Sequence, residues 1–292
     1  MDTGRTEQER RGKAADRRPV ICVKDLYKIY RVGESKVRAL NGVDFTIDRG
    51  TFCSIVGTSG SGKSTLLNMM AGLEKPTKGE IIIAGEHMET KTENQLVAFR
   101  REHIGFIFQS FNLLSTMNAV ENVALPLTFQ GMDKKSRNRK AEEMLNLVGL
   151  KKHKKHKPNQ MSGGQQQRVG VARALVVEPE IIFADEPTGN LDSNTSEEVM
   201  NLMKKVVREK NQTLVMVTHD NYLAGFADII FHIKDGKIVR IEDNREKGNP
   251  EKESLDEAME IRNPEKDSLD EVLEIRPKEE QGKDEENEQT TQ

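Results

Sequence analysis

A glycine-rich run in the first quarter of the sequence has the residue types and spacing of a phosphate-binding loop. The run, GTSGSGKS, matches the pattern G-x-x-x-x-G-K-[S/T]. Glycines let the backbone approach a phosphate, and the start of the helix predicted after them offers unpaired N–H groups and partial positive charge. Lys63 is expected to reach the β- and γ-phosphates of a nucleotide, Ser64 to bind Mg²⁺, and Thr65 to bond the α-phosphate. The candidate phosphate-binding residues are Gly57, Thr58, Ser59, Gly60, Ser61, Gly62, Lys63, Ser64 and Thr65.

A second run could supply the carboxylates that such a site needs. In IIFADE an apolar stretch ends in Asp185 and Glu186. Asp185 is suited to a position near a phosphate-bound metal ion, and Glu186 to orienting and polarising the attacking water as general base. Acidic residues are common at strand ends, and a glycine-rich run can be a structural turn. The structural turn is strongly disfavoured for the glycine-rich run, because the full pattern lies between a predicted strand and a predicted helix. The acidic strand end is weak evidence alone and becomes strong when it is paired with the phosphate loop.

The elements that must position these residues follow from the apolar patterning. Residues 51–56 form a nearly continuous apolar run that predicts a buried strand directly before the glycine-rich turn and a helix directly after it. Residues 111–177 turn helical, which indicates an inserted helical subdomain, and 195–210 predict another helix. Further strands are predicted at 20–32, 43–47, 80–85, 104–109, 180–187 and 213–220, with a hairpin at 228–239 that turns at Asp235 and Gly236.

Composition limits the class of protein. Hydrophobic residues make up 35% and charged residues 32% of the 292 residues, and only two cysteines are present, so a disulfide framework is not expected. No apolar run approaches the ~20 residues that span a bilayer. The first residues lack the apolar core of a signal peptide. The chain is therefore expected to be cytoplasmic.

Both ends of the chain differ from the middle. Residues 1–19 are polar and without period, and are expected to be disordered. Residues 244–292 form an acidic tail in which two consecutive 14-residue segments from Asn249 share 11 identities. From Asn249 on there are 16 acidic and 6 basic residues, a net charge of −10, which leaves about +7 of the total −3 on residues 1–248. The tail is either disordered alone or a docking segment, for a basic partner or for the basic run 151–157; its partner is unknown.

A third glycine motif brings a family resemblance. Ser162, Gly163, Gly164 and Gln165 open a predicted helix between the two motifs above, so they form a second helix start suited to phosphate. In this order and spacing the chain resembles the ABC ATPases, over about residues 20–243. The resemblance assigns Tyr30 to stacking on adenine, Gln109 to the Q-loop that contacts the metal ion, and His219 to the switch position. Asp192 falls in the D-loop, within Asn190, Leu191 and Asp192.

The resemblance implies a fold, a mechanism and partners. The fold is a P-loop NTPase (RecA-like) α/β core with an N-terminal antiparallel β subdomain and an inserted ABC-specific α-helical subdomain at about 111–177. The reaction is hydrolysis of ATP with Mg²⁺. Two copies form a head-to-tail homodimer in which each ATP lies between residues 57–65 of one copy and 162–165 of the other. A membrane permease with a cytoplasmic coupling helix is the implied partner, and it would hold the chain at the inner face of the cell membrane.

Within the family the chain is similar to the lipoprotein-releasing and macrolide-export group (LolD- and MacB-like), which implies export or mechanical work on a permease. The alternative is a soluble ABC-type ATPase acting on nucleic acid or the ribosome. Only about a hundred residues separate the first and third motifs, without the coiled coil of chromosome ATPases, so no nucleic acid is expected. A phosphate-loop kinase or GTPase is disfavoured by the third motif and His219. The basic run 151–157 is either a solvated loop or a site for RNA or lipid head groups.

Overall fold

The computed structural model describes residues 19–33 and 35–245. The segments predicted as a disordered N-terminus and as a repeat-bearing acidic tail lie outside the described residues, apart from Pro19, Asn244 and Arg245. Pro19 already belongs to the first strand, one residue before the start predicted for it. None of the described helices is long and apolar enough to cross a membrane.

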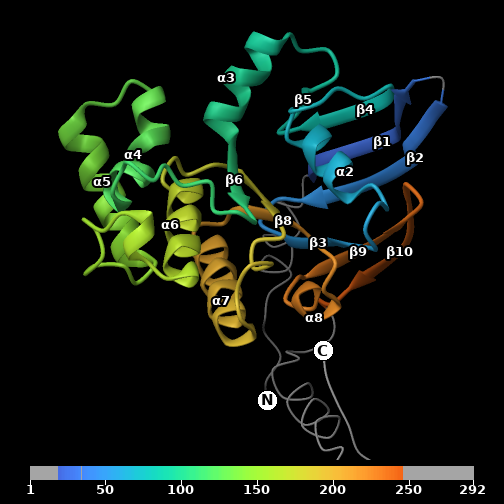
Figure 1. The fold of residues 1–292 in the computed structure, drawn as a ribbon. Coiled ribbons are helices and arrows are strands. Elements are labelled where there is room, and N and C mark those ends of the chain that lie inside the picture. The colour runs from blue at the N-terminus through green and yellow to red at the C-terminus, as the bar shows by residue number, and fades with distance from the viewer. Residues whose placement is uncertain (1–18, 34, 246–292) are drawn as a thin grey trace, which may run out of the picture. The chain divides into compact units, whose positions relative to one another are not determined.

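A six-stranded sheet carries the candidate phosphate loop. Its strands lie in the order β10-β9-β3-β8-β7-β6, and all neighbours are parallel except β10, which pairs antiparallel to β9 (Figure 1). The parallel strands are short and apolar because both faces of the sheet are covered. Their bounds are β3 Phe52–Val56, β6 Ile104–Phe108, β7 Ile181–Asp185, β8 Thr213–Thr218, β9 Ile229–Lys234 and β10 Lys237–Asp243.

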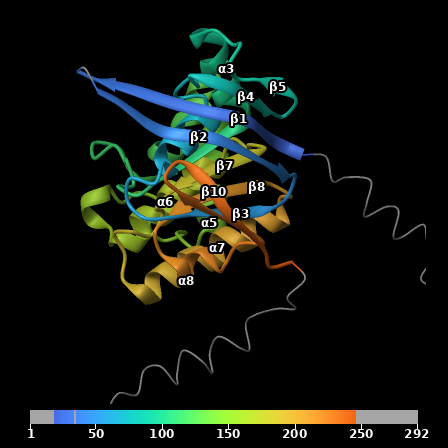
Figure 2. The ribbon, with the colours of Figure 1, turned by 90° about the vertical axis from the view of Figure 1, so that its right-hand side faces the viewer.

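A separate four-stranded antiparallel sheet lies early in the chain, in the order β2-β1-β4-β5. Figure 2 shows the two longest strands, β1 and β2, running side by side. Strand β2 begins eight residues earlier than predicted, because pairing with β1 continues through polar residues up to the pair Val32 and Ser35. The bounds are β1 Pro19–Val32, β2 Ser35–Asp48, β4 Lys78–Ile83 and β5 Glu86–His87.

The helices confirm the predicted helical insertion and add two helices that were not predicted, α3 (Glu93–His103) and the four-residue α8 (Asn221–Ala224). Helix α3 precedes β6; its Thr92 and Gln95 form a capping box, and Leu96 and Phe99 are buried at helical spacing. The capping box was the signal that could have revealed it. The bounds are α2 Lys63–Met70, α3 Glu93–His103, α4 Ala119–Phe129, α5 Lys134–Leu147, η1 (a 3₁₀ turn) Pro158–Gln160, α6 Gly163–Leu175, α7 Ser193–Glu209 and α8 Asn221–Ala224.

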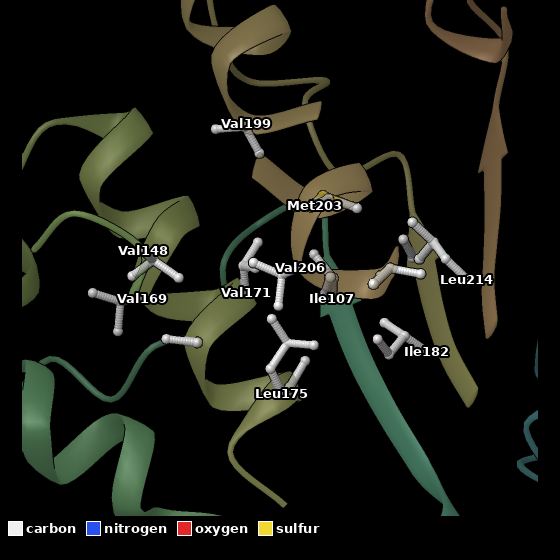
Figure 3. Close-up of a cluster of buried hydrophobic side chains, with 14 of the residues drawn as sticks. Ile107, Val148, Val169, Val171, Leu175, Ile182, Val199, Met203, Val206 and Leu214 are labelled. Carbon is white, nitrogen blue, oxygen red and sulfur yellow. The ribbon is translucent and has the colours of Figure 1, made fainter. Parts of the chain in front are cut away.

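Each face of the six-stranded sheet packs into its own hydrophobic core. Along β3, Phe52 and Val56 belong to one core while Cys53 and Ile55 belong to the other, as the two-residue period of a strand requires. The first core lies against helices α4 to α7; Figure 3 shows α6 and α7 side chains such as Val171 and Met203 near Ile107 and Ile182 of the sheet. The second joins the sheet to α2, α3 and the antiparallel strands. The helical insertion is therefore anchored to the strands that end at the site.

Candidate functional site

The glycine-rich loop leaves β3 at Val56 and enters α2 at Lys63. Gly62 precedes the helix with φ of 104°, and no side chain caps the first turn, so its N–H groups remain available to a ligand. The loop forms one wall of a cavity of about 670 Å³. The cavity is lined by Ala39, Thr58, Ser59, Gly60, Gly62, Lys63, Ser64, Thr65, Glu186 and His219. Residues predicted from two separate motifs thus share one cavity with His219.

The Lys63 side chain stabilises the conformation of the glycine-rich loop. Its Nζ donates to the carbonyl oxygens of Gly57 and Thr58, each at 2.8 Å, and the residue is only 7% exposed. Among the described residues no carboxylate forms an ion pair with Lys63, although the charge of Lys63 acts on Asp185 and partly offsets the rise in the pKa of that carboxyl. A buried cation of this kind favours an anion in the adjoining cavity.

The hairpin of β9 and β10 supports the loop from behind. Its predicted turn is confirmed, with Asp235 and Gly236 both at positive φ. The Gly236 N–H donates to the carbonyl of Ser61 at 3.0 Å. A Cβ built at Gly57 would lie 2.3 Å from the carbonyl oxygen of Ile233, so the loop approaches this hairpin more closely than any side chain would allow.

Two glycines of the loop differ in what surrounds them, which gives a stability prediction. A Cβ at Gly62 would lie 2.5 Å from the carbonyl oxygen of Ala39, at φ of 104°, whereas Gly60, at φ of 78°, has open space. We expect Gly62→Ala to lower the free energy of unfolding by about 2–4 kcal/mol and Gly60→Ala by about 1–2 kcal/mol. Urea unfolding of both variants measures the difference, and equal losses would contradict this account of the loop.

The two acidic residues stand at the end of β7, beside the end of β8. Glu186 has φ of 42°, a strained conformation for a residue with a side chain. Its Oε1 lies 2.8 Å from Nδ1 of His219, which follows β8. The structure therefore brings together two residues that are 33 positions apart in the sequence. Burial raises the pKa of Asp185, and the charge of Glu186 raises it further, so a cation bound nearby would stabilise this carboxylate.

A smaller cavity of about 220 Å³ adjoins the same pair. Glu186 and His219 line both cavities. The smaller one is also lined by hydroxyl groups, among them those of Thr188, Ser196 and Thr218. Glu186 therefore stands between the phosphate-loop cavity and a polar space on its other side.

Gln109 and Tyr30 are placed away from the lining of the larger cavity. Gln109 directly follows β6; its carbonyl accepts a 2.9 Å bond from Asn190 Nδ2, and its side-chain amide packs against Gly189. Tyr30, on β1, donates to Glu74 at 2.6 Å, and the ammonium of Lys28 lies 5.2 Å from its ring centre. Burial and Glu74 raise the pKa of Tyr30. Their predicted roles toward metal ion and adenine stay predictions.

The SGGQ segment starts α6, as predicted. Ser162 accepts from the N–H of Gln165 at 3.3 Å, and the Gln165 side chain accepts from the Ser162 N–H at 3.1 Å, which completes a capping box. A Cβ at Gly164 would lie 2.4 Å from Thr195 Cγ2, so this glycine lets α6 pack closely on α7. Of the described residues that line the two cavities, none belongs to positions 162–165.

Asp192 has a structural role in this single chain. Its carboxylate caps α7 by accepting from the N–H of Thr195 at 3.0 Å, and this bond lowers the pKa of Asp192.

Sequence reasoning missed other contacts near the site. Ala39 lines the larger cavity, His153 Nε2 lies 3.3 Å from Gln165 Nε2, and Arg173 binds the segment after Gln109. No sequence pattern indicates these contacts, because each depends on how elements distant in sequence pack.

Comparison with known proteins places this chain in one family. A family model described as "ABC transporter" matches residues 40–189. An uncharacterised ABC transporter ATP-binding protein of Thermotoga maritima is 48% identical over 223 residues, covering 76% of this chain and 95% of that protein. The macrolide export ATP-binding/permease protein MacB of Shewanella sp. (strain ANA-3) is 46% identical over 227 residues, but the match covers 78% of this chain and only 34% of MacB.

Solved structures agree with the sequence comparisons. The dimeric post-hydrolysis structure of the ATP-binding cassette MJ0796, bound to ADP and Pi, has a TM-score of 0.71 at 45% identity and covers 76% of this chain and 98% of that one. MJ0796 is a protein of Methanocaldococcus jannaschii. The CbiO1 structure from Clostridium perfringens, part of the complex cbiONQ, has a TM-score of 0.72 at 26% identity, covering 84% of this chain and 96% of that one. With the P-loop core, the antiparallel sheet and the helical insertion all in place, the chain belongs to the ABC transporter family, as an ATP-binding subunit with ATPase activity.

Proposed function

We propose that the larger cavity binds the triphosphate of ATP with Mg²⁺ and that the residues predicted from the motifs act there. The glycine-rich loop fits phosphate, since positions 57 and 62 have no room for a Cβ and Lys63 is buried without an ion-pair partner among the described residues. Ser64, Gln109 and Asp185 suit Mg²⁺, which takes few protein oxygens and completes its shell with phosphate and water. The raised pKa of Asp185 supports a cation beside it.

In this mechanism the protein mainly positions groups and stabilises charge. Lys63 and the N–H groups at the start of α2 hold the phosphates. Glu186 orients the attacking water and accepts its proton, and His219 fixes the Glu186 carboxylate, from which its Nδ1 lies 2.8 Å. Mg²⁺, which Ser64, Gln109 and Asp185 would hold, would neutralise charge on the phosphate oxygens. Tyr30 is proposed to stack on adenine.

The catalytic unit is proposed to be a head-to-tail dimer with ATP between 57–65 of one copy and 162–165 of the other. The observation that carries this proposal is that the start of α6, where Ser162 is exposed, contributes nothing to the described cavity lining, although a glycine-rich helix start with a serine suits phosphate. A helix start with this chemistry needs a second copy to reach the phosphate. The structure of MJ0796 bound to ADP and Pi is dimeric, which supports a dimer as the catalytic unit.

Mixing two inactive variants tests the composite site. Ser162→Asp keeps an N-cap residue but adds a negative charge that repels phosphate, and Ser162→Asn is its neutral control. Lys63→Ala disables the phosphate loop and leaves α6 intact. An equal mixture of Ser162→Asp and Lys63→Ala should recover ATPase activity that neither variant shows alone, up to about half of the wild-type rate, because a mixed dimer contains one intact site of two. A mixture as inactive as its components would overturn the composite site.

The partner is proposed to be a membrane permease whose cytoplasmic coupling helix binds near residues 110–130. Leu114 and Phe129 are 44% and 64% exposed there, an apolar surface that suits a partner helix. MacB, whose name joins ATP-binding and permease functions, supports work of MacB or LolD type, and the chain would then lie at the inner face of the cell membrane. None of the relatives reported above is named as a nucleic-acid ATPase. Co-purification of the chain with a permease tests this pairing.

The domain limits are also proposed: residues 20–243 for the nucleotide-binding domain and residues 111–177 for its helical part.

A further inference from the structure

The segment that follows Gln109 has an unusual backbone. Phe111 and Asn112 are consecutive residues with φ of 58° and 48°, so both are left-handed although neither is glycine. Such residues persist only where surrounding contacts hold them, and they concentrate at functional sites. The segment joins β6, which ends directly before Gln109, to the helical part of the chain. Whatever holds residues 111 and 112 therefore also fixes the chain leaving Gln109.

Arg173 makes the contacts that hold these two residues. Its Nη1 donates to the carbonyl of Asn112 at 2.5 Å, and its Nη2 donates to the carbonyl of Phe111 at 2.8 Å. The side chain is half-buried, and burial lowers its pKa. Among the described residues no carboxylate pairs with Arg173. A guanidinium removed from water and directed at two consecutive carbonyls fixes both peptide orientations, which a single ammonium could not do.

Helix α6, which carries Arg173 in its last turn, touches the same segment again at its first turn. A Cβ built at Gly163, the first residue of the helix, would lie 3.8 Å from the ring of Phe111. The Phe111 carbonyl also lies at van der Waals distance from a Cβ built at Gly170. The segment is therefore packed along α6 from the SGGQ end to the Arg173 end.

We propose that Arg173 is a positioning residue that fastens the chain after Gln109 to α6, so that Gln109 and the SGGQ end of the helix keep one geometry. This inference rests on the proposed function, in which Gln109 and residues 162–165 serve ATP hydrolysis. Arg173 acts through Gln109 and touches no nucleotide. Its loss impairs hydrolysis and leaves nucleotide binding by the phosphate loop intact.

The test separates binding from turnover in the full-length subunit. Arg173→Met keeps most of the side-chain length and its apolar packing but removes both hydrogen bonds. We expect kcat for ATP to fall about 10–100-fold, the cost of a small misplacement in a catalytic group. The Kd for ATP should stay within about twofold of wild type, because the loop at Lys63 is untouched. Arg173→Lys, which can serve one carbonyl at a time, should give an intermediate kcat.

The matched control is Arg139→Met, an exposed arginine of α5 in the same helical part, which should leave kcat unchanged. Rates are divided by the amount of bound ATP, so a smaller folded fraction does not imitate the effect. If Arg173→Met proves unstable, Arg173→Lys carries the test. A wild-type kcat in Arg173→Met or Arg173→Lys, or an equal loss of ATP affinity, overturns the inference. If wild-type protein binds ATP but does not hydrolyse it, the proposed function fails instead.

Discussion

Glu186→Gln is expected to lower the rate of ATP hydrolysis by about 10²–10⁴-fold, the range that general base catalysis contributes. The amide keeps the size and shape of the side chain but cannot accept a proton from water. Glu186 is held by His219 at 2.8 Å and lines the phosphate-loop cavity, so its loss should affect the chemical step and leave the phosphate contacts in place. ATP should then bind and persist, and the closed dimer should accumulate.

Two measurements check this expectation. Steady-state phosphate release reports the rate, and gel filtration with MgATP should show a doubled mass for the variant. Glu209→Gln is the control, because Glu209 is an exposed residue at the end of α7 and lines neither cavity. Hydrolysis at the wild-type rate would remove Glu186 from its proposed role. A variant that binds ATP but remains a monomer at every concentration would count against the composite site.

Lys63→Ala is expected to abolish ATP binding at concentrations that saturate the wild type. Lys63 is buried, and among the described residues that line the cavity it is the one lysine or arginine. Charge-assisted hydrogen bonds contribute about 1.5–3 kcal/mol each, so losing the bonds to both phosphates should raise the Kd by about 10²-fold or more. Dimerisation should be lost with binding, because ATP supplies the contacts between the copies.

The loop itself also loses support in this variant. Lys63 donates to two carbonyls of the loop, so a thermal melt must accompany the titration to separate lost contacts from lost fold. Lys75→Ala offers a comparison, since Lys75 is exposed and its ammonium group donates to the carbonyl of Lys91. Calorimetric titration with ATP should give wild-type affinity for Lys75→Ala. Tight ATP binding by a folded Lys63→Ala protein would show that the cavity is not the triphosphate site.

The strands were predictable wherever burial on both faces required an unbroken apolar run, as in 51–56 before the loop. Strand β2 was underestimated because its first residues are exposed and polar, and only pairing with β1 makes them a strand. Helix α3 was missed because few of its residues are apolar and only Leu96 and Phe99 are buried. Local patterns therefore predicted the elements that are buried on most sides. They gave too short a range for β2 and missed α3, because these elements have many exposed residues.

Some parts of the site were likewise predictable from the sequence, and others were not. A backbone that must wrap a phosphate needs glycines at fixed spacing. The loop and the capped start of α6 therefore depend on short local segments, and both were predicted from the sequence. That Glu186 and His219 meet could be inferred because adjacent parallel strands end at the same edge of a sheet. The position of Gln109 against Gly189 could not, since it depends on the path of a loop between distant elements.

By itself the sequence determined the phosphate loop, the acidic strand end and the second helix start, because each is a short segment whose chemistry depends on its own residues and their spacing. Only the tertiary structure decided that Arg173 fastens the left-handed pair Phe111 and Asn112 to α6, and that the start of α6 lies apart from the cavity in one copy. These facts depend on the packing of a helical insertion against a sheet. Packing is set by side chains far apart in the sequence, and no local pattern records it.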